Sequence, residues 1–188
     1  MSKKSYLLNT EPVWRESRPG LRHQIPQSVQ SWIYEAGSLT QRLRDSFGSG
    51  LKVTVLYHDR QKPFISETRL LQLPLQQKTL VREVLLSADG QPLIVARTII
   101  PIKTLIGAQK NLSRLGTRPL GEVIFSYPDL QRLEMDCSCV KLACWTDSIK
   151  QQVGIVKPVW GRRTVYAIKG HELLVNEFFL PNVINELI

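Results

Sequence analysis

Two apolar, β-rich runs joined by a short turn constrain the fold of this chain more than any other feature. The runs cover residues 79–87 and 92–100, and Ala88-Asp89-Gly90-Gln91 stands between them. Asp-Gly between two strands predicts a hairpin, because glycine adopts positive φ without steric cost. Strands joined by so short a turn must be antiparallel, since a parallel connection needs a long crossover. The sequence therefore predicts an antiparallel sheet around this hairpin.

Further segments extend the predicted sheet. Runs rich in β-branched and apolar residues predict strands at 51–57, 164–168 and 173–179. The last two are joined across Lys169-Gly170-His171-Glu172, which predicts a second hairpin. Residues 130–145 indicate one or two more strands. Residues 61–77 contain Pro63 and Pro74 and indicate a loop with a short strand.

Helical spacing is clearest before the first of these strands. Val29, Trp32 and Ile33 recur at helical intervals over 27–33, and Ser38 is suited to cap a helix over 39–47. Residues 105–115 predict another helix, which Gly116 follows. Two segments stay open: a strand or a short helix at 119–125, and a loop or a short helix at 146–156.

The order of elements predicts an α+β fold, with a single antiparallel β-sheet and helices packed on one face. A length of 188 residues suits one domain, so we expect a single domain over 1–188. Within it, residues 1–26 indicate an irregular N-terminal arm, and residues 126–159 indicate an extended or inserted region. The N-terminus lacks the apolar core of a signal peptide, and no apolar run reaches the ~20 residues that span a bilayer. We therefore expect a cytoplasmic protein without stable membrane insertion.

Basic residues outnumber acidic ones, which favours anionic partners. Lysine and arginine total 25 against 16 aspartates and glutamates, a formal charge of +9. Nucleic acid, a membrane surface and a small anionic substrate all fit this charge. The basic residues are scattered along the chain, without the clustered face of a nucleic-acid reader, so we expect a small molecule and no nucleic acid. The adjacent pair Arg162-Arg163 fits either a solvated strand end or a functional role.

The three cysteines, Cys137, Cys139 and Cys144, are too few and wrongly spaced for a zinc site. Alternation along a strand would place the first two on one face, but no fourth ligand follows at the spacing of such a site. We predict buried structural thiols and no metal. An odd number cannot pair completely within the chain, in line with a reducing compartment.

Two charged residues interrupt apolar strands and are candidate site residues. Alternation places Arg82 on the same strand face as Val84 and Leu86, and it places Glu177 with Val175. If these faces point to the core, each charge needs a partner. One interpretation is a salt bridge or an exposed face. The other is a cavity with a cation at one end and a carboxylate at the other, which would suit a small ring acid bearing a hydroxyl.

A third charge, Arg97, lies on the partner strand of the hairpin. It is a further candidate for the cavity, but pairing with Glu83 across the hairpin is the favoured interpretation.

The chain resembles the chorismate lyase family over most of residues 27–181. Five sequence blocks, in the same order as in the family, carry the resemblance: REVLLSADG at 82–90, ARTIIP at 96–101, LGTRPLG at 115–121, WGRR at 160–163 and NEFFLP at 176–181. A sixth, weaker block is SLTQR at 38–42. The family converts chorismate to 4-hydroxybenzoate and pyruvate without metal or organic cofactor. The resemblance implies the same activity here, at the first committed step of ubiquinone or a related quinone.

By the same resemblance, four residues bind the substrate. Arg82 and the backbone N–H groups of Leu120 and Leu39 would hold the ring carboxylate, and Glu177 would meet the ring hydroxyl. Arg82 and Glu177 are the residues assigned to catalysis. The chain departs from the family pattern at Ala96, where a glycine is expected, and in the length of 126–159.

Two rival functions and two mechanisms stay open at this stage. The main rival is a non-catalytic small-acid-binding domain of the same fold, as in effector domains of transcription regulators, although residues 1–26 are too short for the winged helix that usually accompanies one. An RNA-binding module is the other rival. Proton transfer within the substrate and acid–base help from the protein are both compatible with lyase activity. We expect a monomer with chorismate as its substrate and 4-hydroxybenzoate as its product.

Overall fold

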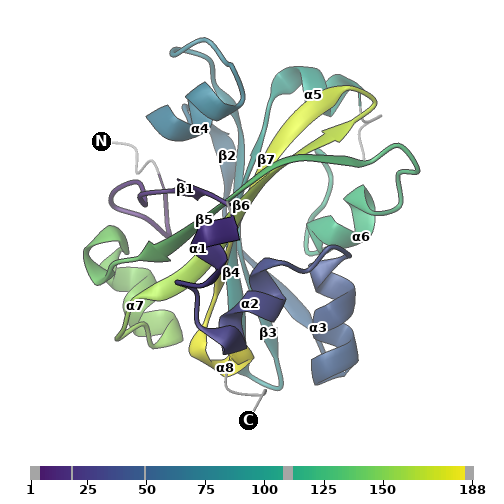
Figure 1. The fold of residues 1–188 in the computed structure, drawn as a ribbon. Helices are drawn as coiled ribbons and strands as arrows, with labels where there is room; N and C mark the ends of the chain where they lie inside the picture. The colour runs from purple at the N-terminus through teal and green to yellow at the C-terminus, as the bar shows by residue number, and fades with distance from the viewer. Residues whose placement is uncertain (1–4, 18, 49, 108–111, 185–188) are drawn as a thin grey trace.

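The computed structural model describes residues 5–17, 19–48, 50–107 and 112–184 (Figure 1). Short helices and long strands follow one another along the chain. The strands are β1 Arg15–Glu16, β2 Lys52–Gln61, β3 Thr79–Ala88, β4 Gln91–Ile100, β5 Gln131–Val140, β6 Val159–Ile168 and β7 His171–Phe179. The helices are α1 Pro19–Arg22, α2 Gln27–Ile33, α3 Leu39–Phe47, α4 Ile65–Leu70, α5 Ile102–Gly107, α6 Leu120–Ile124, α7 Asp147–Val153 and α8 Pro181–Ile184, with a 3₁₀ turn η1 at Leu142–Cys144.

The described strands form one sheet in the order β1-β5-β6-β7-β4-β3-β2, and every pair is antiparallel. The predicted α+β class and its single antiparallel sheet are confirmed. The helices, however, lie on both faces of the sheet and not on one as predicted, since α4 and α7 pack on the face opposite α2 and α3. Both predicted hairpins are present, and both turns use positive φ: 48° and 78° at Asp89 and Gly90, and 51° and 74° at Lys169 and Gly170. Two consecutive residues of positive φ give a turn whose twist matches that of the flanking strands.

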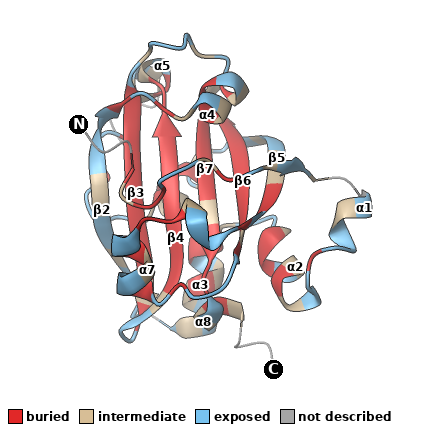
Figure 2. Cartoon of the chain, turned by 90° about the vertical axis from the view of Figure 1, so that its left-hand side faces the viewer, coloured by how far each residue is buried: buried red, intermediate tan, exposed pale blue. Residues whose placement is uncertain are grey.

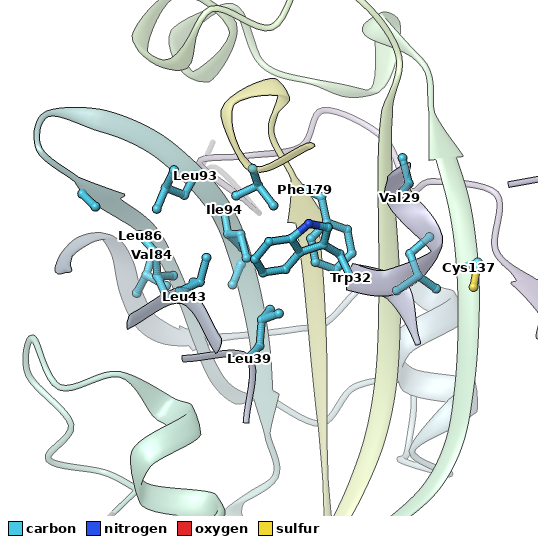
Figure 3. Close-up of a cluster of buried hydrophobic side chains, with 14 of the residues drawn as sticks. Val29, Trp32, Leu39, Leu43, Val84, Leu86, Leu93, Ile94, Cys137 and Phe179 are labelled. Atoms are coloured by element: carbon cyan, nitrogen blue, oxygen red, sulfur yellow. The ribbon is translucent and has the colours of Figure 1, made fainter. Parts of the chain in front are cut away.

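The four central strands are buried on both faces, whereas β2 at one edge is largely exposed (Figure 2). Helices α2, α3 and α6 cover the face that we call the cavity face. Trp32 of α2 packs there against Phe179 of β7, with ring centroids 6.5 Å apart (Figure 3). The opposite face, which we call the arm face, is covered by the N-terminal arm together with α4 and α7. There Leu7, Trp145 and Ile149 pack on the sheet.

The segment predicted as an irregular arm contains two short elements, β1 and α1, and is built into the fold. Ser5, Leu7 and Leu8 are buried, Leu8 bridges to Trp145, and β1 adds a short edge strand beside β5. Backbone hydrogen bonds to β5 and to the segment around Trp145 therefore hold a segment that the sequence indicated only as an irregular arm.

Two local predictions are wrong. The segment 61–77 contains the helix α4 rather than a short strand, because Glu67 accepts a hydrogen bond from the backbone N–H of Phe64 and closes a helical turn. The helix predicted at 105–115 lies earlier, as α5, and 112–114 form turns. Residues 108–111 of that prediction lie outside the described residues. The two open segments, 119–125 and 146–156, contain the helices α6 and α7.

The region 126–159 extends the sheet through β5 and then crosses to the arm face through α7. Its three cysteines are free, but only Cys137 is buried; Cys139 is exposed and Cys144 half-buried, so the prediction of buried thiols holds for one of the three. In the part of the chain that the structure describes, no helix is long and apolar enough to cross a membrane.

Candidate active site

A cavity lies between the cavity face of the sheet and the first residues of α3 and α6. All four predicted site residues line it: Arg82 from β3, Glu177 from β7, Leu39 from α3 and Leu120 from α6. Its remaining wall is mostly apolar and includes Val53, Val84, Leu86, Ile124, Phe125 and Val175. An apolar cavity with a few convergent polar groups is typical of a small-molecule site.

The cavity is larger than a single water site. The volume within which the centre of a water molecule can move is about 50 Å³. A cavity that holds one buried water needs only roughly 10–15 Å³ of such volume. Ala96 is part of the wall and stands between the two charged residues, as the Cα partner of both Val84 and Glu177. Its methyl group narrows the cavity at that point.

Arg82 is a buried cation without a carboxylate partner. Its side chain comes from the middle of β3, and the residue is only 1% exposed. One Nη2 group donates to the backbone carbonyls of Gly116 and Arg118, at 3.0 and 3.1 Å. Among the described residues no carboxylate pairs with it, and its buried Nε has no hydrogen-bond partner. Burial lowers the pKa of Arg82 to about 10, so the guanidinium stays charged at neutral pH.

The N-termini of two helices meet opposite this arginine. Ser38 caps α3 by accepting a hydrogen bond from the N–H of Gln41, as the sequence predicted, and Leu39 is the first helical residue. Leu120 is the first residue of α6, after Pro119. N–H groups of a first helical turn have no intrahelical acceptor, so those of Leu39 and Leu120 suit an anion.

Gly121 allows these helix starts to approach each other. A Cβ atom at this position would lie 2.6 Å from Thr40 Oγ1 and 3.2 Å from Ser38 Oγ. Such a contact would force the two helices apart, so the absence of a side chain keeps Leu39 and Leu120 on the same cavity.

Glu177 forms the other polar end, together with a residue that the sequence analysis did not assign to the site. Arg162 Nε donates to Glu177 Oε2 at 2.7 Å, and both residues line the cavity. Arg162 is 1% exposed, so its interpretation as a solvated strand end is wrong. The signal for it was the predicted pairing of the last two strands, which places Arg162 and Glu177 opposite each other as Cα partners.

The two polar ends are separated along and across the sheet. Arg82 lies two strands from Glu177 and two residues along, so their Cα atoms are about 12 Å apart by ordinary sheet geometry. Both residues line the cavity that lies between them. This arrangement suits one ring that carries an anionic group at one end and a hydroxyl at the other.

Tyr166 adds a phenol close to the Glu177 end. Burial and the neighbouring Glu177 carboxylate raise the pKa of Tyr166, so its hydroxyl stays protonated at neutral pH. The hydroxyl oxygen accepts a hydrogen bond from Arg132 Nη2 at 3.1 Å.

The other candidate residues lie outside the cavity. Arg97 points to the arm face and pairs with Glu83 at 2.7 Å, as expected, and also with Glu67 at 2.8 Å. Arg163 pairs with Asp136 at 2.7 Å on the same face. The cysteines do not line the cavity. Over the described ranges, no cluster of three or more His, Cys, Asp or Glu side chains could hold a metal ion.

Comparison with known proteins places this chain among enzymes of one family. Residues 10–187 match the family model described as chorismate lyase. The chain is 40% identical over 157 residues to the "Probable chorismate pyruvate-lyase" of Methylococcus capsulatus, covering 84% of this chain and 97% of that protein. A protein of the same name from Thiobacillus denitrificans is 35% identical over 160 residues, covering 84% and 85%.

Solved structures of other proteins share the fold. The effector domain of PhnF from Mycobacterium smegmatis superposes with a TM-score of 0.55 at 14% identity, covering 78% of this chain and 90% of that one. The C-terminal domain of the histidine utilization repressor from Pseudomonas syringae gives a TM-score of 0.52 at 9% identity, with coverage of 70% and 92%. At these identities the likeness concerns the fold alone.

Proposed function

The chain belongs to the chorismate lyase family, and from this premise we propose that it cleaves chorismate to 4-hydroxybenzoate and pyruvate. The observation that carries the proposal is the cavity with Arg82 at one end and Glu177 at the other. Its two polar ends match the carboxylate and the hydroxyl of the aromatic product, and its apolar walls match the ring.

Arg82 is the proposed anchor of the ring carboxylate. A guanidinium presents parallel N–H donors that fit the two oxygens of a carboxylate. Arg82 is buried, charged and without a carboxylate partner among the described residues, so a ligand anion would supply the missing charge. The backbone N–H groups of Leu39 and Leu120 would complete the carboxylate site.

Glu177 is the proposed acceptor for the ring hydroxyl. Arg162 occupies its Oε2 atom, whereas Oε1 accepts no hydrogen bond from a described residue. A hydroxyl group at this end of the cavity can therefore donate to Oε1.

The proposed reaction needs no redox partner. The ether bond between ring C3 and the enolpyruvyl oxygen breaks, and its electrons form the ketone of pyruvate. The C4 proton moves to the enolpyruvyl methylene carbon, which becomes the methyl group, and the C4–H electrons complete the aromatic ring. The protein's part is to hold a reactive conformer in a closed, apolar site. The alternative is proton removal by Glu177, and the Glu177→Gln variant distinguishes the two mechanisms.

The wider setting is also part of this proposal. The product would be the first committed precursor of ubiquinone or a related quinone, made in the cytoplasm by a monomer that uses no cofactor.

Direct assay of the purified protein tests the activity. Treated with a chelator and mixed with chorismate, it should release pyruvate and 4-hydroxybenzoate in equal amounts. Binding of chorismate without turnover would instead favour a small-acid-binding domain, the role that the shared effector-domain fold suggests. Activity that returns only with added metal would contradict the cofactor-free mechanism.

A further inference from the structure

The Arg162 side chain joins two parts of the cavity wall that are far apart in the sequence. Its Nε atom donates to Glu177 Oε2 at 2.7 Å. Its Nη1 atom donates to the backbone carbonyls of Ile33 and Glu35, at 3.0 and 2.9 Å. These carbonyls belong to the end of α2 and the turn that leads into α3. One guanidinium therefore contacts both the carboxylate end of the cavity and the connection that precedes Leu39.

From these contacts we infer that Arg162 is a positioning residue, which fixes Glu177 so that Oε1 faces the ring hydroxyl of the ligand. The inference rests on the proposed function for the identity of that ligand. The guanidinium occupies one carboxylate oxygen and leaves the other for the hydroxyl.

The geometry favours this role over one in folding alone. Arg162 is 1% exposed and lines the cavity, and its ion pair with Glu177 joins cross-strand neighbours on β6 and β7. A buried guanidinium needs a counter-charge in either role, but both partners of this ion pair line the cavity, and Glu177 Oε1 accepts no hydrogen bond from a described residue. Here the carboxylate contact is the shortest of the four that the guanidinium makes.

Two ligands separate positioning from folding. Benzoate has the carboxylate of 4-hydroxybenzoate but lacks the hydroxyl, so only 4-hydroxybenzoate should depend on Glu177. Calorimetric titration of the wild type should show tighter binding of 4-hydroxybenzoate. Arg162→Gln should lower the affinity for 4-hydroxybenzoate about ten-fold, because it costs one charge-assisted hydrogen bond. It should leave benzoate affinity close to that of the wild type.

The conservative variant and a matched control complete the experiment. Arg162→Lys keeps a charge but cannot reach the carboxylate and the carbonyls together, so it should recover part of the lost affinity. Arg163→Lys alters the neighbouring arginine, which pairs with Asp136 on the arm face, and it should keep the wild-type preference. In a Glu177→Gln background, Arg162→Lys should cause little further loss of 4-hydroxybenzoate affinity.

The outcomes distinguish the two proposals. The positioning role would be overturned if Arg162→Gln and Arg162→Lys lowered the affinities for 4-hydroxybenzoate and benzoate equally. It would also be overturned if the losses of 4-hydroxybenzoate affinity caused by Arg162→Lys and Glu177→Gln were fully additive. If Arg162→Gln does not fold, the lysine variant and the double variant still decide. Equal affinity of the wild type for both ligands would overturn the proposed ligand orientation, and failure to turn over chorismate would overturn the proposed activity alone.

Discussion

At the scale of single residues, the cavity is defined by charges that a core would otherwise exclude. Burying an unpaired charge is costly, so a buried arginine without a carboxylate partner indicates that something else completes it. Arg82 has two carbonyl acceptors and no ion pair with a described residue. What the Arg82 guanidinium lacks is a negatively charged partner, and the carboxylate of a ligand would supply one.

The first prediction concerns Arg82. Arg82→Ala should lower 4-hydroxybenzoate affinity by about ten-fold to more than a hundred-fold, since it removes charged hydrogen bonds worth roughly 1.5–3 kcal/mol. Arg82→Lys should restore only part of this, because an ammonium cannot reproduce the guanidinium fork. Titration calorimetry measures the affinities, and a thermal melt confirms that each variant folds. Wild-type affinity in Arg82→Ala would reject the assignment.

The second prediction concerns Glu177, where the two mechanisms differ. Glu177→Gln keeps an acceptor oxygen and the shape, so loss of charge assistance alone should slow the reaction roughly ten- to thirty-fold. If Glu177 removes the C4 proton, the loss should reach about 10²–10⁴-fold. We expect the smaller effect, because the enolpyruvyl group can take the proton itself.

Single-turnover rates are the right measurement for this variant, since slow product release can hide a change in chemistry. A thousand-fold loss with unchanged product affinity would identify Glu177 as the catalytic base.

The sequence predicted four lining residues of the cavity but not Arg162. Arg82 and Glu177 stood out because a charge inside an apolar strand is unusual whatever the fold. Arg162 follows Gly161 and precedes Arg163, near the start of its strand, so nothing local separated it from a solvated end. Its partner Glu177 is 15 residues away and becomes adjacent only once the hairpin register is known. To predict which side chains meet across strands, the pairing register must be known as well as the alternation of side chains along each strand.

At the scale of elements, a buried ionic network fastens the arm and α4 to the sheet. Arg97 pairs with Glu83 and Glu67, both almost fully buried. Glu83 also accepts hydrogen bonds from Ser5 Oγ and from the N–H of Tyr6, at 2.5 and 2.6 Å. The Arg97 guanidinium thus bridges two carboxylates: Glu83, which holds the N-terminal arm, and Glu67 of α4.

The third prediction tests this network. Arg97→Gln leaves two buried carboxylates facing each other without a cation, so the free energy of unfolding should fall by about 3–5 kcal/mol. Chemical denaturation followed by fluorescence measures it. Lys150→Gln is the matched control: it removes the cation of the exposed Lys150–Asp147 pair, and the unfolding midpoint should not move. Equal midpoints for wild type and Arg97→Gln would show that the network adds nothing to stability.

The fourth prediction concerns the cysteines of 126–159, two on β5 and one at the end of η1. No residue of 126–159 lines the cavity, and burial raises the pKa of Cys137 to about 11, so its thiol is unreactive at neutral pH. Replacing Cys137 with Ala, and Cys139 and Cys144 with Ser, should leave the single-turnover rate close to wild type. Lost packing at Cys137 should lower the unfolding free energy by about 1 kcal/mol. A large rate loss in a variant that still unfolds cooperatively would connect this region to the cavity.

Elements with strong local signals were predicted well and the others were not. The two hairpins follow from Asp89-Gly90 and Lys169-Gly170, and the start of α3 follows from Ser38. By contrast, α4 has six residues between prolines and depends on contacts of Glu67 with Arg97, 30 positions away. Two-residue β1 exists only because β5 is there to pair with it. Short elements of this kind are specified by tertiary contacts, which no local pattern encodes.

At the scale of the whole molecule, net charge and fold affect different steps: the net charge affects capture of the substrate, and the fold affects the reaction of the bound substrate. A chain of charge +9 should attract the proposed dianionic substrate from solution, whereas the cavity should act after binding.

The fifth prediction follows from that separation. Raising the ionic strength from ~0.01 to ~1 M shortens the screening length from ~30 to ~3 Å, so kcat/KM for chorismate should fall several-fold. The single-turnover rate at saturating chorismate should stay constant, because charges within the cavity are screened much less. Rapid-mixing measurements at both salt concentrations provide the comparison. A kcat/KM that does not depend on salt would remove any role for the net charge in capture.

The central strands carry charged or polar residues on both the cavity face and the arm face, so residue number alone tells a protein engineer which face a substitution will alter. On β3 and β4, side chains with even numbers lie on the cavity face, as Arg82 and Ala96 do, and those with odd numbers lie on the arm face, as Glu83 and Arg97 do. On β7 the parity is reversed, and Glu177 lies on the cavity face. A randomised library confined to one parity should therefore alter substrate preference, and a library of the other parity should alter thermal tolerance, although both would mutate the same few strands.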